Sequence, residues 1–155
     1  MSTAYRIADE PAPSALARFA VNPLYPFLTM MLGGTWIAWP WFALNSFAVG
    51  SPSRRRELLW LSAGAVAALV LSFGIFALVG SGTLPPKAAR YAILTVVVAK
   101  LATSYAVFTL QSRTIEIYEY YGGKLQSGVL PLLLTFILGS RVIEQLPVVW
   151  RMVLQ

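Results

Sequence analysis

The sequence predicts an all-α integral membrane protein, with four transmembrane helices joined by short loops in an antiparallel bundle. Of its 155 residues, 57% are hydrophobic and 12% are charged, whereas a soluble domain carries about 25% charged residues. The apolar residues form four blocks, each close to the roughly 20 residues that a helix needs to cross a bilayer. These blocks run approximately over 24–49, 58–79, 88–110 and 128–149.

The residues outside the blocks are too few for a separate soluble domain. Residues 1–22 form a polar N-terminal tail, 23–150 the transmembrane domain, and 151–155 a C-terminal tail. Acidic residues and prolines stand where a signal peptide would carry its apolar core, so we expect the tail to be retained. The loops at 50–56 and 80–86 are short, which favours antiparallel packing of neighbouring helices.

The first block carries an aromatic cluster of Trp36, Trp39 and Trp41 around Pro40. The proline is expected to kink the helix, because it donates no hydrogen bond and its ring clashes with the preceding turn. The cluster is either a flat wall for a quinone, lipid tail or pigment, or a packing surface for a partner helix, the commoner role. Asn45 is expected to hydrogen-bond to a neighbouring helix.

The second block contains small residues at four-residue spacing, Gly64, Ala68 and Ser72. This pattern lets two membrane helices approach closely, and the glycine pair at 33–34 is the expected mate.

Lys100 stands in the middle of the third block. Spacings of three, four, eleven and fourteen residues place Thr103, Ser104, Gln111 and Thr114 on the same helix face. A charged side chain that faces lipid at mid-depth costs at least about 2.5–3.5 kcal/mol. We therefore expect Lys100 to face protein, water or a counter-ion.

The fourth block leaves three interpretations of this charge open. Arg141 and Glu144 share a helix face there, and Glu144 is a candidate counter-ion for Lys100. The preferred interpretation is an ion pair that joins helices or subunits, and the second is a charged pathway or anion site. In the third, the helix ends at Arg141 and residues 142–155 lie along the membrane interface. The candidate polar or ion-pair site comprises Asn45, Lys100, Ser104, Arg141 and Glu144.

The positive-inside rule does not orient four spans. With both termini on one side of the membrane, five Lys and Arg residues lie on each side. The adjacent Arg54, Arg55 and Arg56 favour the cytoplasm for their loop, and hence the outside for the termini. The same arginines are candidate ligands of anionic lipid head groups. The expected location is the inner (cytoplasmic) membrane of a prokaryote.

The chain contains no cysteine and no histidine. These absences exclude disulfides, thiolate metal ligands, a cysteine nucleophile and the commonest general base. The sequence also lacks a phosphate loop, a nucleophile elbow and a zinc signature. We therefore expect no enzymatic activity, no cofactor, no metal and no nucleic-acid partner.

These observations favour a non-enzymatic multi-pass membrane subunit that packs against partner proteins and stabilises a larger membrane complex. The expected partners are membrane lipids and either other membrane protein subunits or further copies of the chain. The alternative is a small self-associating channel or transporter for anions that uses Lys100 and Arg141. The surroundings of Lys100 distinguish the two, because a nearby Glu144 indicates a structural lock and a wet cavity indicates conduction.

Overall fold

A computed structural model gives the fold. It describes residue 11 and residues 14–155, except for the side chains of residue 86 and residues 138–143. Most of the expected N-terminal tail therefore lies outside the described residues. The described residues form one 3-10 helix and six α-helices, with no strand beyond an isolated bridge. They are η1 (Ala17–Phe19), α1 (Leu24–Gly33), α2 (Thr35–Val49), α3 (Arg54–Gly80), α4 (Pro86–Tyr120), α5 (Val129–Glu144) and α6 (Val148–Leu154).

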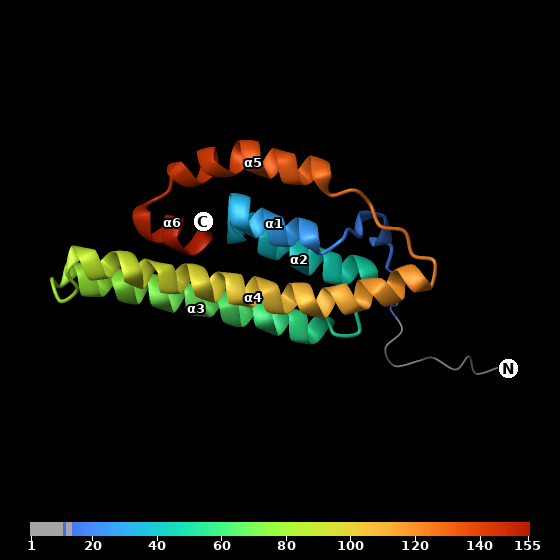
Figure 1. Cartoon of the computed structure of the whole chain (residues 1–155), viewed down its shortest axis with the longest axis horizontal. Helices are drawn as coiled ribbons and strands as arrows, with labels where there is room; N and C mark the ends of the chain where they lie inside the picture. Colours follow the sequence, from blue (N-terminus) through green and yellow to red (C-terminus); the bar gives the residue numbers. More distant parts are fainter. Residues whose placement is uncertain (1–10, 12–13) are drawn as a thin grey trace.

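The helices α3 and α4 form a long antiparallel hairpin (Figure 1). They have 27 and 35 residues, which correspond to about 40 and 52 Å of helix. Within the described chain these are the two helices long and apolar enough to cross a membrane. Gly64 lets them approach closely, because the side chain of Thr103 occupies the space that a Cβ atom would need. The expected mating of Gly64 with the glycine pair at 33–34 is therefore wrong.

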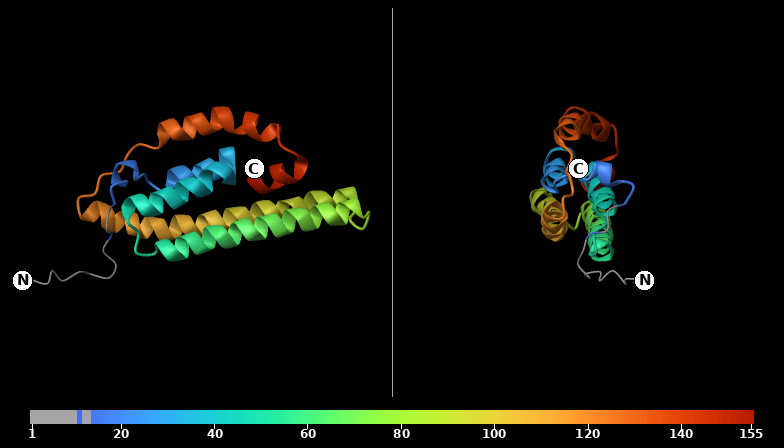
Figure 2. Two further views of the ribbon diagram at one scale, coloured as in Figure 1. Left: turned by 180° about the vertical axis from the view of Figure 1, so that it is seen from behind. Right: turned by 90° about the vertical axis from the view of Figure 1, so that its right-hand side faces the viewer.

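The first apolar block is not one helix, as the sequence predicted, but two helices that fold back on each other. The helix α1 ends at Gly33 and α2 begins at Thr35, and Gly34 between them has a φ of 88°. The α2 helix continues through Pro40. The chain thus reverses at Gly34, because a positive φ carries no steric penalty for glycine. The start of α1 and the end of α2 therefore lie at the same end of the molecule (Figure 2).

The fourth block is also broken. The helix α5 ends at Glu144, and α6 begins at Val148 and turns back beneath α5 toward the centre of the molecule (Figure 1). Val153 in α6 is buried. The block is therefore neither a single span to residue 149 nor a helix that stops at Arg141 before an interfacial tail.

The helices α6 and α2 lie end to end beside α3 and α4 (Figures 1 and 2). At the junction, Thr35 Oγ1 donates hydrogen bonds of 3.0 and 3.1 Å to the carbonyls of Val153 and Leu154. The two helices have 7 and 15 residues, which together correspond to about 33 Å. Two distant pieces of chain thus build one rod, which α1 and α5 cover.

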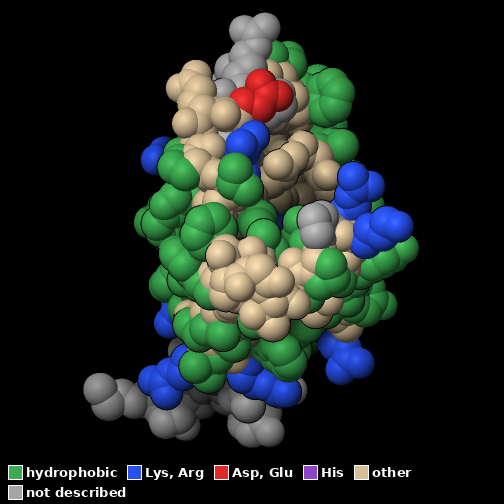
Figure 3. Space-filling view, turned by 90° about the vertical axis from the view of Figure 1, so that its left-hand side faces the viewer, with side chains coloured by type: hydrophobic (Ala, Val, Ile, Leu, Met, Phe, Trp, Pro, Cys, Tyr) green, Lys and Arg blue, Asp and Glu red, His purple; other side chains and the backbone are tan. Residues whose placement is uncertain are grey.

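The interior of this bundle is rich in polar side chains and its outer surface is apolar. The buried polar residues are Thr29, Thr35, Asn45, Ser46, Ser51, Glu57, Ser72, Lys100, Thr103, Ser104, Gln111, Thr114 and Thr135. By contrast, Leu59, Val70 and Phe136 are 68%, 65% and 62% exposed. Figure 3 shows hydrophobic side chains over much of the flanks, in a view from the end where α3 joins α4. Apolar residues such as Phe42 and Val107 are also buried, so the feature that departs from a soluble domain is the extent of the exposed apolar surface together with the many buried polar side chains.

Candidate functional site

The polar stripe predicted on the third block faces the interior. Lys100, Thr103, Ser104, Gln111 and Thr114 of α4 are all buried. The helical period that placed them on one face also turns that face toward α2, α3 and α6. The stripe meets three different environments along α4: a helix end, an aromatic groove and a buried carboxylate.

Lys100 caps the C-terminal end of α6. Its side chain is 2% exposed, and Nζ donates a 2.8 Å hydrogen bond to the carbonyl of Met152. The last carbonyls of a helix lack intrahelical donors and carry the negative end of the helix dipole, so a lysine there is favourable. Because Gly64 meets Thr103, Lys100 lies level with Ala67, near the middle of the apolar part of α3. The lysine therefore fixes the end of α6 to the middle of α4.

The prediction that Glu144 is the counter-ion of Lys100 is wrong within this chain. Glu144 is exposed at the last residue of α5, whereas the described bond of Lys100 is to a backbone carbonyl. Arg141 lies in α5, and the structure does not describe its side chain. Within the described chain Lys100 therefore caps a helix and does not pair with Glu144, and an ion pair between subunits stays a prediction.

A groove of about 470 Å³ runs beside Lys100, between α4 and α6. We call it the basic groove, and it is lined by Lys100, Arg151, Val97, Val148 and Met152 together with three further residues. Arg151 Nε is buried and has no hydrogen-bond partner among the described residues. No Asp or Glu side chain of the described chain lines the groove. Two cations and the polar Gln155 thus share a groove whose other lining residues are apolar, and the cations favour an anionic group there.

The fully buried Glu57 is a site residue that the sequence did not reveal. Its carboxylate accepts hydrogen bonds from Ser51 Oγ at 2.5 Å, Ser53 Oγ at 2.6 Å and Gln111 Nε2 at 3.0 Å, and also from Ser46 Oγ. All four donors are neutral. They come from α2, the 50–53 loop and α4, so one carboxylate joins three parts of the chain.

Asn45 extends this network to the N-terminal segment. Its Nδ2 donates to Gln111 Oε1 at 3.1 Å, and its Oδ1 accepts from the backbone N–H of Val21 at 2.9 Å. The predicted hydrogen bond from Asn45 to a neighbouring helix is confirmed. The side-chain donors and acceptors of this network bond to one another. The role of the network is therefore to hold helices together.

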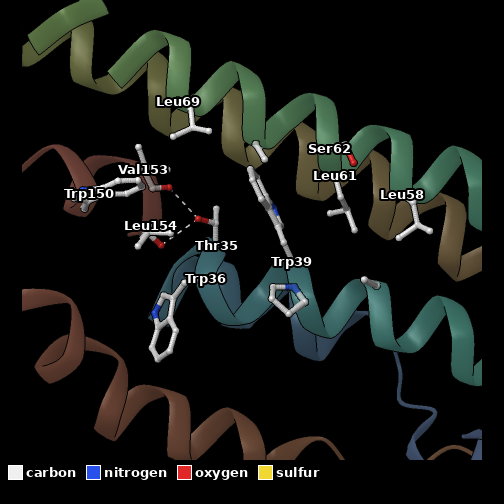
Figure 4. Close-up of a pocket in the computed structure, with 13 residues that line it drawn as sticks. Thr35, Trp36, Trp39, Leu58, Leu61, Ser62, Leu69, Trp150, Val153 and Leu154 are labelled. Atoms are coloured by element: carbon white, nitrogen blue, oxygen red, sulfur yellow. Dashed lines mark hydrogen bonds between the residues drawn. The ribbon is translucent and has the colours of Figure 1, made fainter. Parts of the chain in front are cut away.

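An aromatic groove of about 590 Å³ opens between α2, α3 and α6 (Figure 4). Trp36, Trp39 and Trp150 line it, whereas Trp41 does not. Trp39 stands between α2 and α3, and its Nε1 donates a 2.9 Å hydrogen bond to Ser104 Oγ. Two of the three predicted tryptophans thus share an apolar groove that has the volume for a hydrocarbon chain or bulky side chains.

The three adjacent arginines lie exposed in the first turn of α3. The guanidinium of Arg54 stacks over the ring of Phe47, 4.8 Å from its centroid. Arg56 lines an outward groove of about 340 Å³ with Leu59, Trp60 and Ala63. This juxtaposition of a cation and an apolar channel suits a phospholipid, with the phosphate at Arg56 and the acyl chain along α3.

No family model, curated protein or solved structure matches this chain. Its function is therefore inferred from the geometry and chemistry of these residues alone.

Lys100→Met is expected to loosen α6 without a large change in global stability. The variant loses the bond to Met152, but it also removes a charge that is costly to bury, so the two effects on the free energy of unfolding oppose each other. Hydrogen–deuterium exchange in detergent should accelerate in residues 148–155 and stay unchanged in 58–72. The control is Lys87→Met, because Lys87 is exposed. Unchanged exchange in α6 would show that Thr35 is a sufficient cap.

Proposed function

We propose that this chain is a non-enzymatic integral membrane protein of a prokaryotic inner membrane. In this arrangement α3 and α4 cross the bilayer, with α5 and the α6–α2 rod embedded beside them. The extensive exposed apolar surface supports the proposal, because hydrocarbon solvates the exposed Leu59, Val70 and Phe136. The broken backbone at Gly34 lies against Leu154 and Gln155, in keeping with the rule that irregular backbone at membrane depth must be buried in protein.

We further propose that the protein assembles with partner helices and stabilises a larger membrane complex. The basic groove carries this proposal. Among its described lining residues are Lys100 and Arg151 but no carboxylate side chain. Arg151 Nε is buried without a hydrogen-bond partner among the described residues, and an unpaired cation at membrane depth is costly. An acidic residue on a partner helix would relieve that cost while fixing the position of the partner.

The test is purification of a tagged copy in mild detergent, followed by mass spectrometry. Stoichiometric partners with an acidic residue near the middle of a transmembrane helix are expected. Arg151→Leu should reduce their yield at least several-fold, whereas Arg90→Leu, which changes an exposed arginine outside the groove, should not. A homogeneous preparation of this chain alone, unaffected by Arg151→Leu, would overturn the subunit proposal.

Anion permeation is the second candidate, favoured by the same pair of cations beside the helix junction. Small-anion flux into liposomes that contain the purified protein measures it directly. Flux that falls in Lys100→Met and in Arg151→Leu would favour a channel or transporter over a subunit. Flux equal to that of protein-free liposomes would remove this candidate.

A further inference from the structure

The N-terminal segment lies beside the end of α2, not at the opposite end of the molecule. Ser14 Oγ donates a 2.8 Å hydrogen bond to the carbonyl of Phe47, and Val21 N–H donates to Asn45 Oδ1 at 2.9 Å. A hydrophobic cluster joins the same parts of the chain to α4, and its buried members are Ala20, Ala48, Val49, Ile115 and Tyr118. The α1–α2 hairpin therefore starts and finishes at one end of the bundle (Figure 2).

If the chain sits in a membrane as proposed above, this geometry changes its topology. The 10 residues of α1 correspond to about 15 Å, half of the roughly 30 Å hydrocarbon core. The hairpin enters from one side, reverses at Gly34 near half height, and leaves on the same side. Residues 14–22 then share a side with the 50–53 loop, whereas one continuous span would separate them.

The same geometry separates the charges into two unequal groups. We call the end where α1 starts and α2 finishes the basic end. The Lys and Arg residues of the described chain at this end are Arg18, Arg54, Arg55, Arg56, Arg113 and Lys124. Lys87 and Arg90 lie at the opposite end, in the first turn and a half of α4. Arg151 lies in the basic groove between the ends, so the equal division expected for four full spans disappears.

We infer that α1–α2 is a re-entrant hairpin and that the basic end is an interaction surface for the anionic lipid head groups of the cytoplasmic leaflet. An excess of Lys and Arg near span ends faces the cytoplasm, and clustered cations there attract anionic lipids. Arg56 and Trp60, one turn apart on the outward groove of α3, place a phosphate ligand and an interfacial aromatic ring at the expected depth. The orientation expected from the sequence, with the N-terminal segment outside, is thereby reversed for that segment.

Single cysteines test this topology directly, because the natural chain has none. Ser14→Cys, Pro52→Cys and Thr83→Cys each change an exposed residue outside the helices. A membrane-impermeant maleimide should label residues 14 and 52 only in inverted inner-membrane vesicles, and residue 83 only in intact spheroplasts. Residues 14 and 52 on opposite sides would overturn the re-entrant hairpin. Residues 14 and 52 together on the outer side would overturn the assignment to the cytoplasmic leaflet.

A charge variant tests the contribution of the basic end. Replacing Arg54, Arg55 and Arg56 by Gln leaves three cations at this end against two at the other. The expected result is mixed labelling of residue 52 from both sides. The matched control, Lys87→Gln with Arg90→Gln, increases the difference between the ends and should leave the orientation uniform. Uniform cytoplasmic labelling in both variants would overturn the head-group role of these arginines.

Alkaline carbonate extraction separates failure of this inference from failure of the proposed membrane location. A protein that stays in the membrane pellet but shows residues 14 and 52 on opposite sides contradicts the re-entrant hairpin alone. A protein that carbonate releases contradicts the membrane location, and the inference that rests on it.

Discussion

Glu57→Ala is expected to destabilise the protein by roughly 2–4 kcal/mol, because buried donors lose their shared acceptor. Ser46, Ser51 and Gln111 are themselves buried around the carboxylate. Some of the loss is recovered, since Ser46 Oγ and Gln111 Nε2 also donate to the carbonyl of Phe42, at 3.1 and 2.8 Å. A titration of the unfolding transition with SDS, followed by circular dichroism, measures the change in the free energy of unfolding.

Glu57→Gln and Glu116→Ala are the matched controls. The glutamine keeps the volume and one acceptor oxygen but sets an amide N–H₂ against the donors of its neighbours, so an intermediate loss is expected. Glu116 is exposed on α4, and its replacement should change the free energy of unfolding by at most about 0.5 kcal/mol. Equal stability of the parent and Glu57→Ala would show that the carboxylate does not hold α2, α3 and α4 together.

Periodicity was sufficient to predict the helical class and the buried face of α4. Lys100, Ser104 and Gln111 recur at helical spacing in an apolar run, and an apolar run with one polar stripe has few ways to pack. The stripe faces inward as expected. What periodicity cannot supply is the partner of each polar group. The carbonyl of Met152 is 52 residues from Lys100 in the chain, and only the folded α6 brings it there.

Hydropathy did not predict where the apolar blocks break. A long apolar block and a hairpin of two short helices can have the same mean hydropathy, so block length alone favours one span. The decisive local signal is Gly33-Gly34, since Gly34 adopts a φ of 88° that other residues rarely tolerate. Pro147 at the start of α6 gives a second signal, because proline is favoured at helix starts and disfavoured within helices.

Glu57 was missed because its sequence neighbours suggest a solvated surface. It follows three arginines in the first turn of α3, a pattern typical of an exposed charged helix start. A weaker signal was present in Ser51 and Ser53, which are residue types that donate to a nearby carboxylate. Gln111 lies 54 residues away, and it could be assigned to Glu57 only after α3 and α4 were paired.

Gly34→Ala should be among the most destabilising single substitutions in this chain, at about 3 kcal/mol or more when the conformational and packing costs are added. The backbone at Gly34 has a φ of 88° and a ψ of −179°, a region that is essentially restricted to glycine and costs other residues about 1–3 kcal/mol. A Cβ there would also meet the carbonyl oxygen of Leu154 and lie 2.8 Å from Gln155 Cα. Since these are backbone atoms and cannot rotate away, α6 must move, which adds about 1–3 kcal/mol.

Gly82→Ala is the control for a positive φ without a packing contact. Gly82 has a φ of 73°, but a Cβ atom added there would meet nothing within 4 Å among the described residues. It therefore carries the conformational cost alone, about 1–2 kcal/mol. The excess loss in Gly34→Ala, measured by SDS titration, combines the stricter backbone conformation at Gly34 with its contact to α6, and hydrogen exchange isolates the contact. Hydrogen exchange in residues 148–155 should rise only in Gly34→Ala. Equal losses in the two variants, with α6 unaffected, would contradict an α6–α2 junction closed by Gly34 and make the end-to-end rod untenable.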